Sequence, residues 1–401
     1  MRRSARRVCG LLASLLLLAS CSAPQESPCV LAADEMPESW RPAGQVQEGL
    51  ATGPWTASES EEAAFTVRKG VEEMAELYGR RPAAVADLWE DSVASLIEVT
   101  YGSANTAAVD ELARDAARNN LTILIQPYQD RDPGEARCAD YGSVLPLALY
   151  AHNQYQENDN RVGHMVDFAN SAFAQCRSLS EAMEIDYEPL FAAGEASLEE
   201  AFDLMIWGLL LIEAQVVPGM EMPAESRGFP AELWRFFQGY PLPGAAQFPD
   251  GADDDEFIET AYLATHIAYI PTGNHRFPIY VEDAPNVYDF HRENFYAVLE
   301  MGELDLVAEF VDSLRQYGCT AENDLQVRDG TRYMLDVFHS GGDRWMAYRE
   351  PGQTDEDVDD YDLIHKAWTA VLGVREREIE QPAPGNYGGV VRGWLPDPSA
   401  R

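Results

Sequence analysis

The sequence is short of positive charge. Its 401 residues include 29 lysines and arginines against 68 aspartates and glutamates, which gives a formal net charge of −39. Nucleic acid is therefore not expected as a partner, because binding to phosphates requires a basic surface. The simplest interpretation of the excess acid is a solvated shell that keeps the protein soluble. A cation-binding surface is the alternative.

Motifs that identify common enzyme classes are also missing. The sequence contains no His-Glu-x-x-His, no Gly-x-Ser-x-Gly and no glycine-rich phosphate loop. No two cysteines form a close pair, which argues against a cysteine-based zinc site, and the acidic runs do not match a calcium loop. We expect no bound metal and no cofactor. Three ligands drawn from His266, His365 and Asp362 are conceivable, but they lack a diagnostic spacing.

The N-terminus has a basic start and a short apolar run. Arginines at positions 2, 3, 6 and 7 precede the apolar residues 8–18, and the sequence then continues Leu18-Ala19-Ser20-Cys21. This order is typical of a secretory signal peptide, and the apolar run is too short to span a bilayer. Removal of these four arginines from the precursor, whose charge is −39, would leave a mature chain near −43.

The Leu18-Ala19-Ser20-Cys21 segment resembles the lipobox of bacterial lipoproteins. The resemblance implies that the signal peptide 1–20 is removed and that Cys21 is acylated, which anchors the protein to a lipid bilayer of the cell envelope. Ser22 stands where this family has Asp for retention in the inner membrane, so the outer membrane is favoured if the host has two membranes. An ordinary secretory signal is the alternative.

Composition divides the rest of the chain into three parts. Residues 21–60 are rich in Ser, Ala, Pro, Glu and Gly and predict a flexible tether, in which Trp40 and Trp55 are the side chains best suited to dock on a domain. Residues 61–380 predict one domain, and residues 381–401 predict a loose C-terminal tail.

Four cysteines, Cys29, Cys138, Cys176 and Cys319, remain for disulfides in an exported mature chain. They allow three connectivities, among which the sequence does not decide. We favour a bond between Cys138 and Cys176, because both flank the same helical stretch.

The sequence of this domain predicts an all-α fold. Amphipathic helices are expected over 61–78, 84–100, 106–118, 141–157, 162–177, 197–215, 254–271, 288–301, 303–318 and 359–376, with shorter ones near 230–238 and 331–340. The segments 121–125 and 279–281 are short and β-prone. About twelve helices permit six helical hairpins closed into an (α/α)6 toroid, and equally a solenoid or an irregular bundle.

Two helices share a pattern that suggests internal repetition. Tyr262-Leu-Ala-Thr-His266-Ile-Ala-Tyr269 and Tyr361-Asp-Leu-Ile-His365-Lys-Ala-Trp368 both read Tyr-x-x-x-His-x-Ala-aromatic. The three marked positions of each pattern lie on one helix face. In a toroid, these faces would line the central cavity. The Thr-His-x-x-Tyr segment and the helix spacing resemble toroid proteins of the cyclase-like and sugar-processing kinds.

The candidate binding or catalytic residues follow from these two faces. They are His266, Tyr262, Tyr269, His365, Tyr361 and Trp368, with the acids Glu259, Asp255 and Asp362 on or beside the same faces. The structural alternative is that the rings pack between helices and that the acids mark helix N-termini. On a loop, His275-Arg276 could contact an anionic ligand or simply lie on the surface.

Two functions remain open. The first is an envelope lipoprotein that binds a small molecule, a glycan or a protein through a helical cavity lined by histidine and aromatic side chains. The second is a toroid-type enzyme acting on envelope carbohydrate or a similar substrate. In the enzyme, a histidine would be the general acid or base and the neighbouring carboxylates its partners.

Overall fold

A computed structural model describes residues 28–42, 50, 52–155, 159–273, 275, 279–350, 352–354, 356 and 358–377. Cys21, the signal peptide and the C-terminal tail lie outside the described residues. The described chain is all-α, as predicted, with one isolated bridge between Ser103 and Arg377 as its β-type pairing. None of its helices is both long and apolar enough to cross a membrane.

The helices have the following bounds: α2 Ala57–Arg80, α3 Pro82–Asp87, α4 Asp91–Glu98, α5 Ala107–Gln129, α6 Tyr141–Gln154, α7 Asn160–Phe173, α8 Leu179–Met183, α9 Tyr187–Ala193, α10 Leu198–Ala214, α11 Ala224–Gly239, α12 Asp255–Ile267, α13 Tyr269–Thr272, α14 Pro285–Met301, α15 Leu304–Gln316, α16 Leu325–Ser340 and α17 Asp360–Val374. Short 3₁₀ helices cover Glu38–Trp40, Pro133–Glu135, Cys138–Asp140, Ala245–Gln247, Gly251–Asp253, Val281–Asp283 and Trp345–Ala347.

Seven of the described α-helices begin after a residue whose side chain caps the first turn. The Ser197 hydroxyl accepts a hydrogen bond from the backbone N–H of Glu200 at the start of α10, and the Glu200 carboxylate accepts one from the backbone N–H of Ser197. Asp254 caps α12 in a simpler way, by accepting from the N–H of Glu256. Such caps satisfy backbone donors that the first turn leaves unpaired.

Three expectations about local structure were wrong. The β-prone segment 279–281 forms no strand, because its first two residues are irregular and Val281 begins a 3₁₀ helix. The β-prone residues 121–125 continue α5, where Leu121, Leu124 and Ile125 are buried on the face that also carries Ala117. Packing of that helical face outweighs the weak strand preference of a few residues. The helix expected over 84–100 is broken into α3 and α4, because Trp89 adopts a left-handed conformation with φ of 45°.

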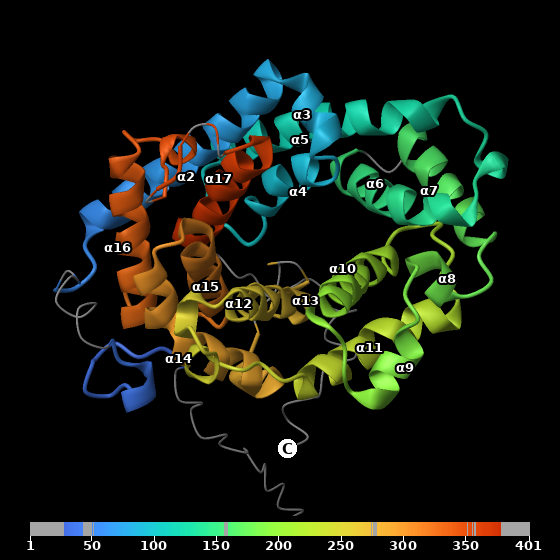
Figure 1. The fold of residues 1–401 in the computed structure, drawn as a ribbon. Helices are drawn as coiled ribbons and strands as arrows, with labels where there is room; N and C mark the ends of the chain where they lie inside the picture. The colour runs from blue at the N-terminus through green and yellow to red at the C-terminus, as the bar shows by residue number, and fades with distance from the viewer. Residues whose placement is uncertain are drawn as a thin grey trace, which may run out of the picture.

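The long helices alternate between two layers, with α4, α6, α10, α12, α15 and α17 in the inner layer. Neighbouring inner helices pack against one another from α6 through α10, α12, α15 and α17 to α4, and α5 bridges α4 and α6. Figure 1 shows α4 and α17 across the centre of the molecule from α10, α12 and α13. The remaining long helices, α2, α5, α7, α11, α14 and α16, each pack on the outside of an inner helix.

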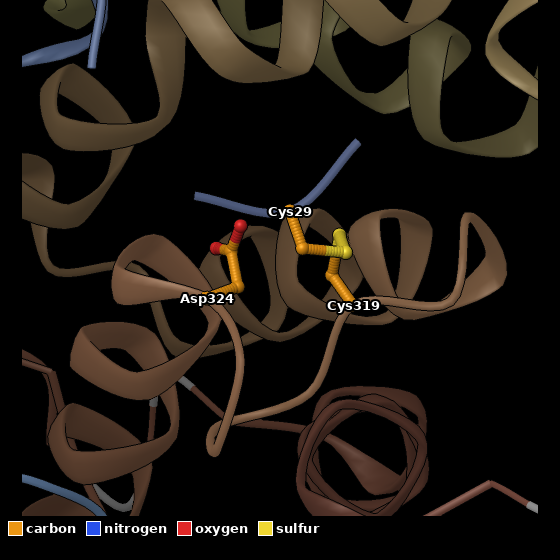
Figure 2. A group of neighbouring side chains, drawn as sticks. All are labelled: Cys29, Cys319 and Asp324. Atoms are coloured by element: carbon orange, nitrogen blue, oxygen red, sulfur yellow. A yellow bond between two sulfur atoms is a disulfide. The ribbon is translucent and has the colours of Figure 1, made fainter. Parts of the chain in front are cut away.

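The four cysteines form two disulfides. Cys138 and Cys176 form a disulfide, which confirms the predicted pairing, and Cys29 forms the second with Cys319. The second bond holds part of the expected tether against the domain (Figure 2). The described residues 28–42 therefore differ from the unattached segment that composition alone suggested.

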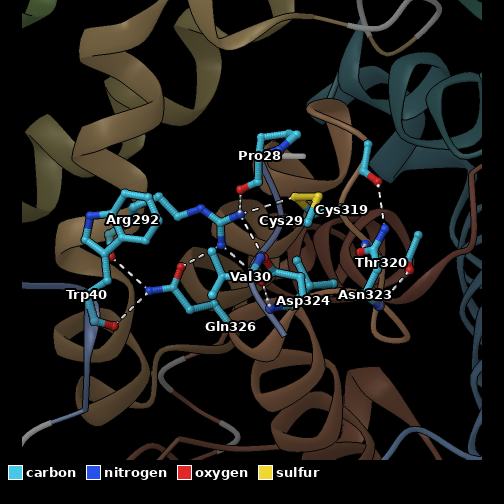
Figure 3. Close-up of polar contacts among 12 residues, drawn as sticks. Pro28, Cys29, Val30, Trp40, Arg292, Cys319, Thr320, Asn323, Asp324 and Gln326 are labelled. Atoms are coloured by element: carbon cyan, nitrogen blue, oxygen red, sulfur yellow. Dashed lines mark hydrogen bonds and ion pairs between the residues drawn. A yellow bond between two sulfur atoms is a disulfide. The ribbon is translucent and has the colours of Figure 1, made fainter. Parts of the chain in front are cut away.

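Arg292 reinforces the attachment of this segment (Figure 3). Its guanidinium donates to both carboxylate oxygens of Asp324, at 3.0 and 2.8 Å, and to the backbone oxygen of Pro28 at 2.9 Å. Asp324 also accepts from the backbone N–H of Val30 at 3.0 Å. The ion pair is fully buried, so its hydrogen bonds to the N-terminal segment offset part of its desolvation cost. Trp40, as expected, docks on the domain, edge-on to Tyr288.

Candidate functional site

A cavity of about 610 Å³ lies between the six inner helices. Its lining falls into three chemical groups. The acids are Glu90, Asp91, Glu98, Glu213, Glu259, Asp305 and Asp362, the aromatic and imidazole rings are Tyr101, Tyr150, Phe202, Tyr262, His266, Tyr269, Tyr361, His365 and Trp368, and the rest are Ala94, Ile97, Pro146, Leu149, Met205, Ile206, Leu209 and Leu210. The volume is within the range of small-molecule sites.

The structure brings both predicted histidine faces into this one cavity. Of the candidate residues, the two histidines, the four aromatic residues, Glu259 and Asp362 all line it. Asp255 is the exception: it occupies the exposed first position of α12 and is not part of the lining. That position fits the alternative interpretation, in which an acid complements the N-terminal end of the helix dipole.

His266 is held by its own helix. Its Nδ1 lies 2.8 Å from the backbone oxygen of Tyr262, one turn earlier. Because a carbonyl only accepts, Nδ1 carries the hydrogen, and in the neutral ring Nε2 has the lone pair. Among the described residues we find no hydrogen bond to Nε2. Tyr269 follows after the helix is interrupted at Ala268, and its ring centroid lies 5.1 Å from that of His266.

His365 is sandwiched on α17. The Tyr361 ring stacks on it at 5.2 Å with an interplanar angle of 16°, and Trp368 meets it edge-on at 6.1 Å. Asp362, on the same helix, is partly committed to structure, because its carboxylate accepts from the backbone N–H of Asp359 in a reciprocal cap.

Two carboxylates on α15, Asp305 and Glu309, connect the two histidine faces. Asp305 Oδ2 accepts a hydrogen bond from the Tyr262 hydroxyl at 2.8 Å and lies 3.3 Å from His365 Nδ1. One turn on, Glu309 places one oxygen 3.6 Å from His266 Nδ1 and the other 3.8 Å from His365 Nε2. Both histidines therefore have a carboxylate neighbour, and Glu309 lies between them.

Sequence reasoning missed both of these acids. They lie on an amphipathic helix together with Asp312, at a spacing of four and then three residues. Such an acidic stripe normally faces water, and nothing local distinguishes this one. The sequence did offer one clue: the acidic stripe of α15 is a suitable partner for the histidine faces of α12 and α17. Such pairing is expected because charged side chains are seldom buried without partners.

The charges of this group are coupled. Burial by itself would raise the pKa of Asp305, but hydrogen bonds from His365 and Tyr262 hold it below its usual range. Burial disfavours the charged form of His365, yet Asp305 and Glu309 together raise its pKa above the usual value. Burial also raises the pKa of Glu309, although both histidines oppose the effect. The arrangement therefore favours a protonated His365 next to an ionised Asp305.

A second acidic pair lies at the start of α4. Burial, followed by the charge of Asp91, raises the pKa of Glu90 to about 7, and burial raises the pKa of Asp91 as well. The pair directly follows Trp89, whose φ of 45° is unusual for a bulky residue. Strained backbone of this kind often accompanies functional sites.

The described residues include one group of three potential metal ligands whose ligand atoms lie within 4.8 Å of one another: Cys29, Cys319 and Asp324. Its two sulfurs are joined in a disulfide and so are not available as thiolate ligands (Figure 2). His266, His365 and Asp362 do not meet this distance in the described structure.

A scan against family models finds no match, and searches of the curated proteins and of the solved structures find none either.

Proposed function

We propose that this chain is a lipid-anchored protein of the bacterial cell envelope whose central cavity binds a neutral or cationic ligand that carries hydroxyl groups. The observation that carries the proposal is the composition of the cavity wall: seven carboxylates and seven aromatic residues, with no lysine or arginine among the lining residues.

Charge defines the class of ligand. Carboxylates around a partly enclosed cavity repel an anion and attract a cation, and His365 is the lining group favoured to carry a positive charge. Ionised carboxylates accept hydrogen bonds, so hydroxyl and ammonium groups are their natural partners. Flat rings such as Tyr361 and Trp368 offer apolar surface to a ring-shaped ligand. A neutral sugar or an amino sugar combines these properties.

We further propose that the domain is an (α/α)6 toroid. Inner helices that line the cavity alternate along the chain with outer helices that do not, and α17 packs against both α2 and α4. The two histidine faces lie on the fourth and sixth inner helices, that is, two helical hairpins apart, as a repeat of one hairpin unit would place them.

Anchoring through Cys21 would hold the domain close to the bilayer. Cys29 is fixed to Cys319, so only residues 22–28 separate the acylated position from the domain surface, and eight Cα–Cα steps lead from Cys21 to Cys29. Fully extended, they reach at most about 29 Å. Globomycin treatment, which blocks cleavage of lipoprotein precursors, tests the anchor: accumulation of an uncut, lipid-labelled precursor is expected, and normal release of an unlabelled chain would contradict it.

Calorimetric titration of the mature chain with sugars tests the cavity. We expect binding of chito-oligosaccharides or glucosamine and no binding of oligogalacturonate, which is anionic. Glu259→Gln should weaken binding, while Glu256→Gln, the same change on the same helix but outside the cavity lining, should not. Tight binding of the anionic sugar, or equal effects of the two substitutions, would overturn the proposal.

An enzyme is the second candidate, favoured by the carboxylates that join His266 and His365. His266 Nε2 would accept a proton, and a charged His365 would donate one, in the hydrolysis of a glycosidic bond. Release of reducing ends from envelope glycan should be abolished by His266→Ala and retained in His339→Ala, whose ring contacts Glu62 and Asp343 elsewhere on the surface. Sugar binding without turnover would support the ligand-binding function and contradict the enzymatic one.

A further inference from the structure

A second group of charged side chains lies behind the cavity, between α15 and the end of α17. Its members are Asp312, Arg315, Arg375 and Arg377, and their side chains are at least nine-tenths buried. Tyr269 separates this group from the cavity: its ring packs at 4.3 Å against His275, whose Nε2 lies 2.7 Å from Asp312 Oδ2.

The arginines are fixed by backbone acceptors. Arg375 Nη1 donates to the backbone oxygen of Glu98 at 2.5 Å, and Arg377 Nη2 donates to that of His275. Arg315 donates to the backbone oxygen of Gly373 at 2.8 Å and to the Thr331 hydroxyl at 3.0 Å. These bonds hold the three guanidinium groups in place without neutralising their charge.

Several buried donors have no hydrogen-bond partner in the described structure. They are Nε and Nη2 of Arg375, Nε and Nη1 of Arg377, and the hydroxyl of Ser103, which is bridged to Arg377 through the backbone. Asp312 Oδ1, a buried acceptor that also lacks a hydrogen bond, lies 3.7 Å from Arg377 Nη1 and 3.9 Å from Arg375 Nη2. Both distances are too long for a hydrogen bond.

The charges of the group do not balance. Among the described residues, three buried guanidinium groups face one buried carboxylate, that of Asp312, and the half-buried Glu98 adds a second negative charge that acts on Arg375. His275 contributes no charge at pH 7, because burial lowers its pKa to about 4. Glu376, next in sequence to Arg375, is exposed to solvent. Water could satisfy the free N–H donors, but it would not offset the excess positive charge, which is expensive to bury.

We propose that a small inorganic anion of the halide class occupies this position, where it accepts hydrogen bonds from the unused N–H groups of Arg375 and Arg377. A crevice of about 130 Å³ lies beside the group and is lined in part by Arg315 and Arg377. The site differs from the central cavity in charge, so the two positions select ligands of opposite sign.

Anomalous diffraction and thermal unfolding test the site in the mature chain with both disulfides intact. Crystals soaked in sodium bromide should show an anomalous peak beside Arg375 and Arg377. At constant ionic strength, replacement of gluconate by chloride should raise Tm saturably, by about 2 °C at a tenfold excess over the dissociation constant.

Three variants provide controls. Arg377→Gln should remove the chloride response, and Arg80→Gln, which breaks a surface pair with Glu76, should keep it. Asp312→Asn should increase the rise of Tm with chloride, because it removes the carboxylate that competes with the anion. The measurement is made on the fraction of this variant that folds. No bromide peak in the wild-type crystal together with a Tm independent of the anion would overturn the proposal, whichever variants fold. Loss of sugar binding would not affect it.

Discussion

The hydroxyl of Tyr262 donates a hydrogen bond of 2.8 Å to Asp305 Oδ2, and so ties α12 to α15 at the wall of the cavity. The same oxygen lies 3.3 Å from His365 on α17. One carboxylate thereby connects three of the six inner helices and sets the charge of one histidine.

Asp305→Asn should lower the pKa of His365. Removal of a carboxylate that lies in contact with an imidazole typically shifts the pKa by one unit or more. Titration of the histidine ring signals by NMR measures the change. Asp115→Asn, on the exposed face of α5, should leave the pKa of His365 unaltered. An unchanged titration in Asp305→Asn would mean that Glu309 alone determines the charge of His365.

Glu90→Gln should change how stability depends on pH. The pKa of Glu90 is raised to about 7 in the folded chain from an ordinary value of 4.5, so the folded state binds this proton more tightly than the unfolded state. The contribution of Glu90 to the free energy of unfolding is therefore fully present below about pH 4.5, and it is lost as the pH rises through 7. The free energy of unfolding of Glu90→Gln, relative to wild type, should therefore rise between pH 5 and pH 8.

The comparison between variant and wild type is necessary because other groups titrate nearby. Glu303, with a pKa of about 7, acts in the same direction as Glu90. His275 and His291, with pKa values lowered to about 4 by burial, act in the opposite direction between pH 4 and 6.5. Urea unfolding at each pH gives the difference directly, and a difference that does not vary with pH would refute the prediction.

Gly373→Ala should destabilise the fold. A Cβ at this position would lie 2.7 Å from the backbone oxygen of Ala308 and 2.9 Å from its Cα, where α17 meets α15. We expect a loss of about 1–3 kcal/mol or more, because backbone atoms cannot move aside easily. Gly163→Ala on α7 meets no atom within 4 Å and should instead stabilise by about 0.5–1 kcal/mol through helix propensity. Chemical denaturation of the two variants measures both signs.

Replacement of Cys138 and Cys176 together by Ala should lower the free energy of unfolding by about 2–4 kcal/mol, chiefly because the unfolded chain gains freedom when a loop with a sequence separation of 38 residues is opened. The cavity helices do not include either cysteine, so sugar binding at low temperature should persist. Calorimetric unfolding of oxidised wild type and of the double variant provides the test. Equal Tm values would show that the bond does not constrain the unfolded chain.

Local signals in the sequence determined the all-α class and most helix positions, whereas the pairing of Cys138 with Cys176, which the sequence only favoured, was decided by the tertiary structure. A helix reveals itself through the 3.6-residue period of its apolar side chains and through caps such as Ser197, both of which involve near neighbours in the chain. The same periodicity placed Tyr262 and His266 on one face, and Tyr361 and His365 on another.

Only the tertiary structure decided what those faces meet. Glu259 and Asp255 share a face of α12, yet the cavity ends between them, so one lines it and the other does not. The acidic stripe of α15 is an ordinary amphipathic pattern until α12 and α17 cover it and bury Glu309 between two histidines. Burial, and with it every shifted pKa in the site, depends on residues distant in the sequence, because desolvation is set by whatever the folded chain packs around a charge.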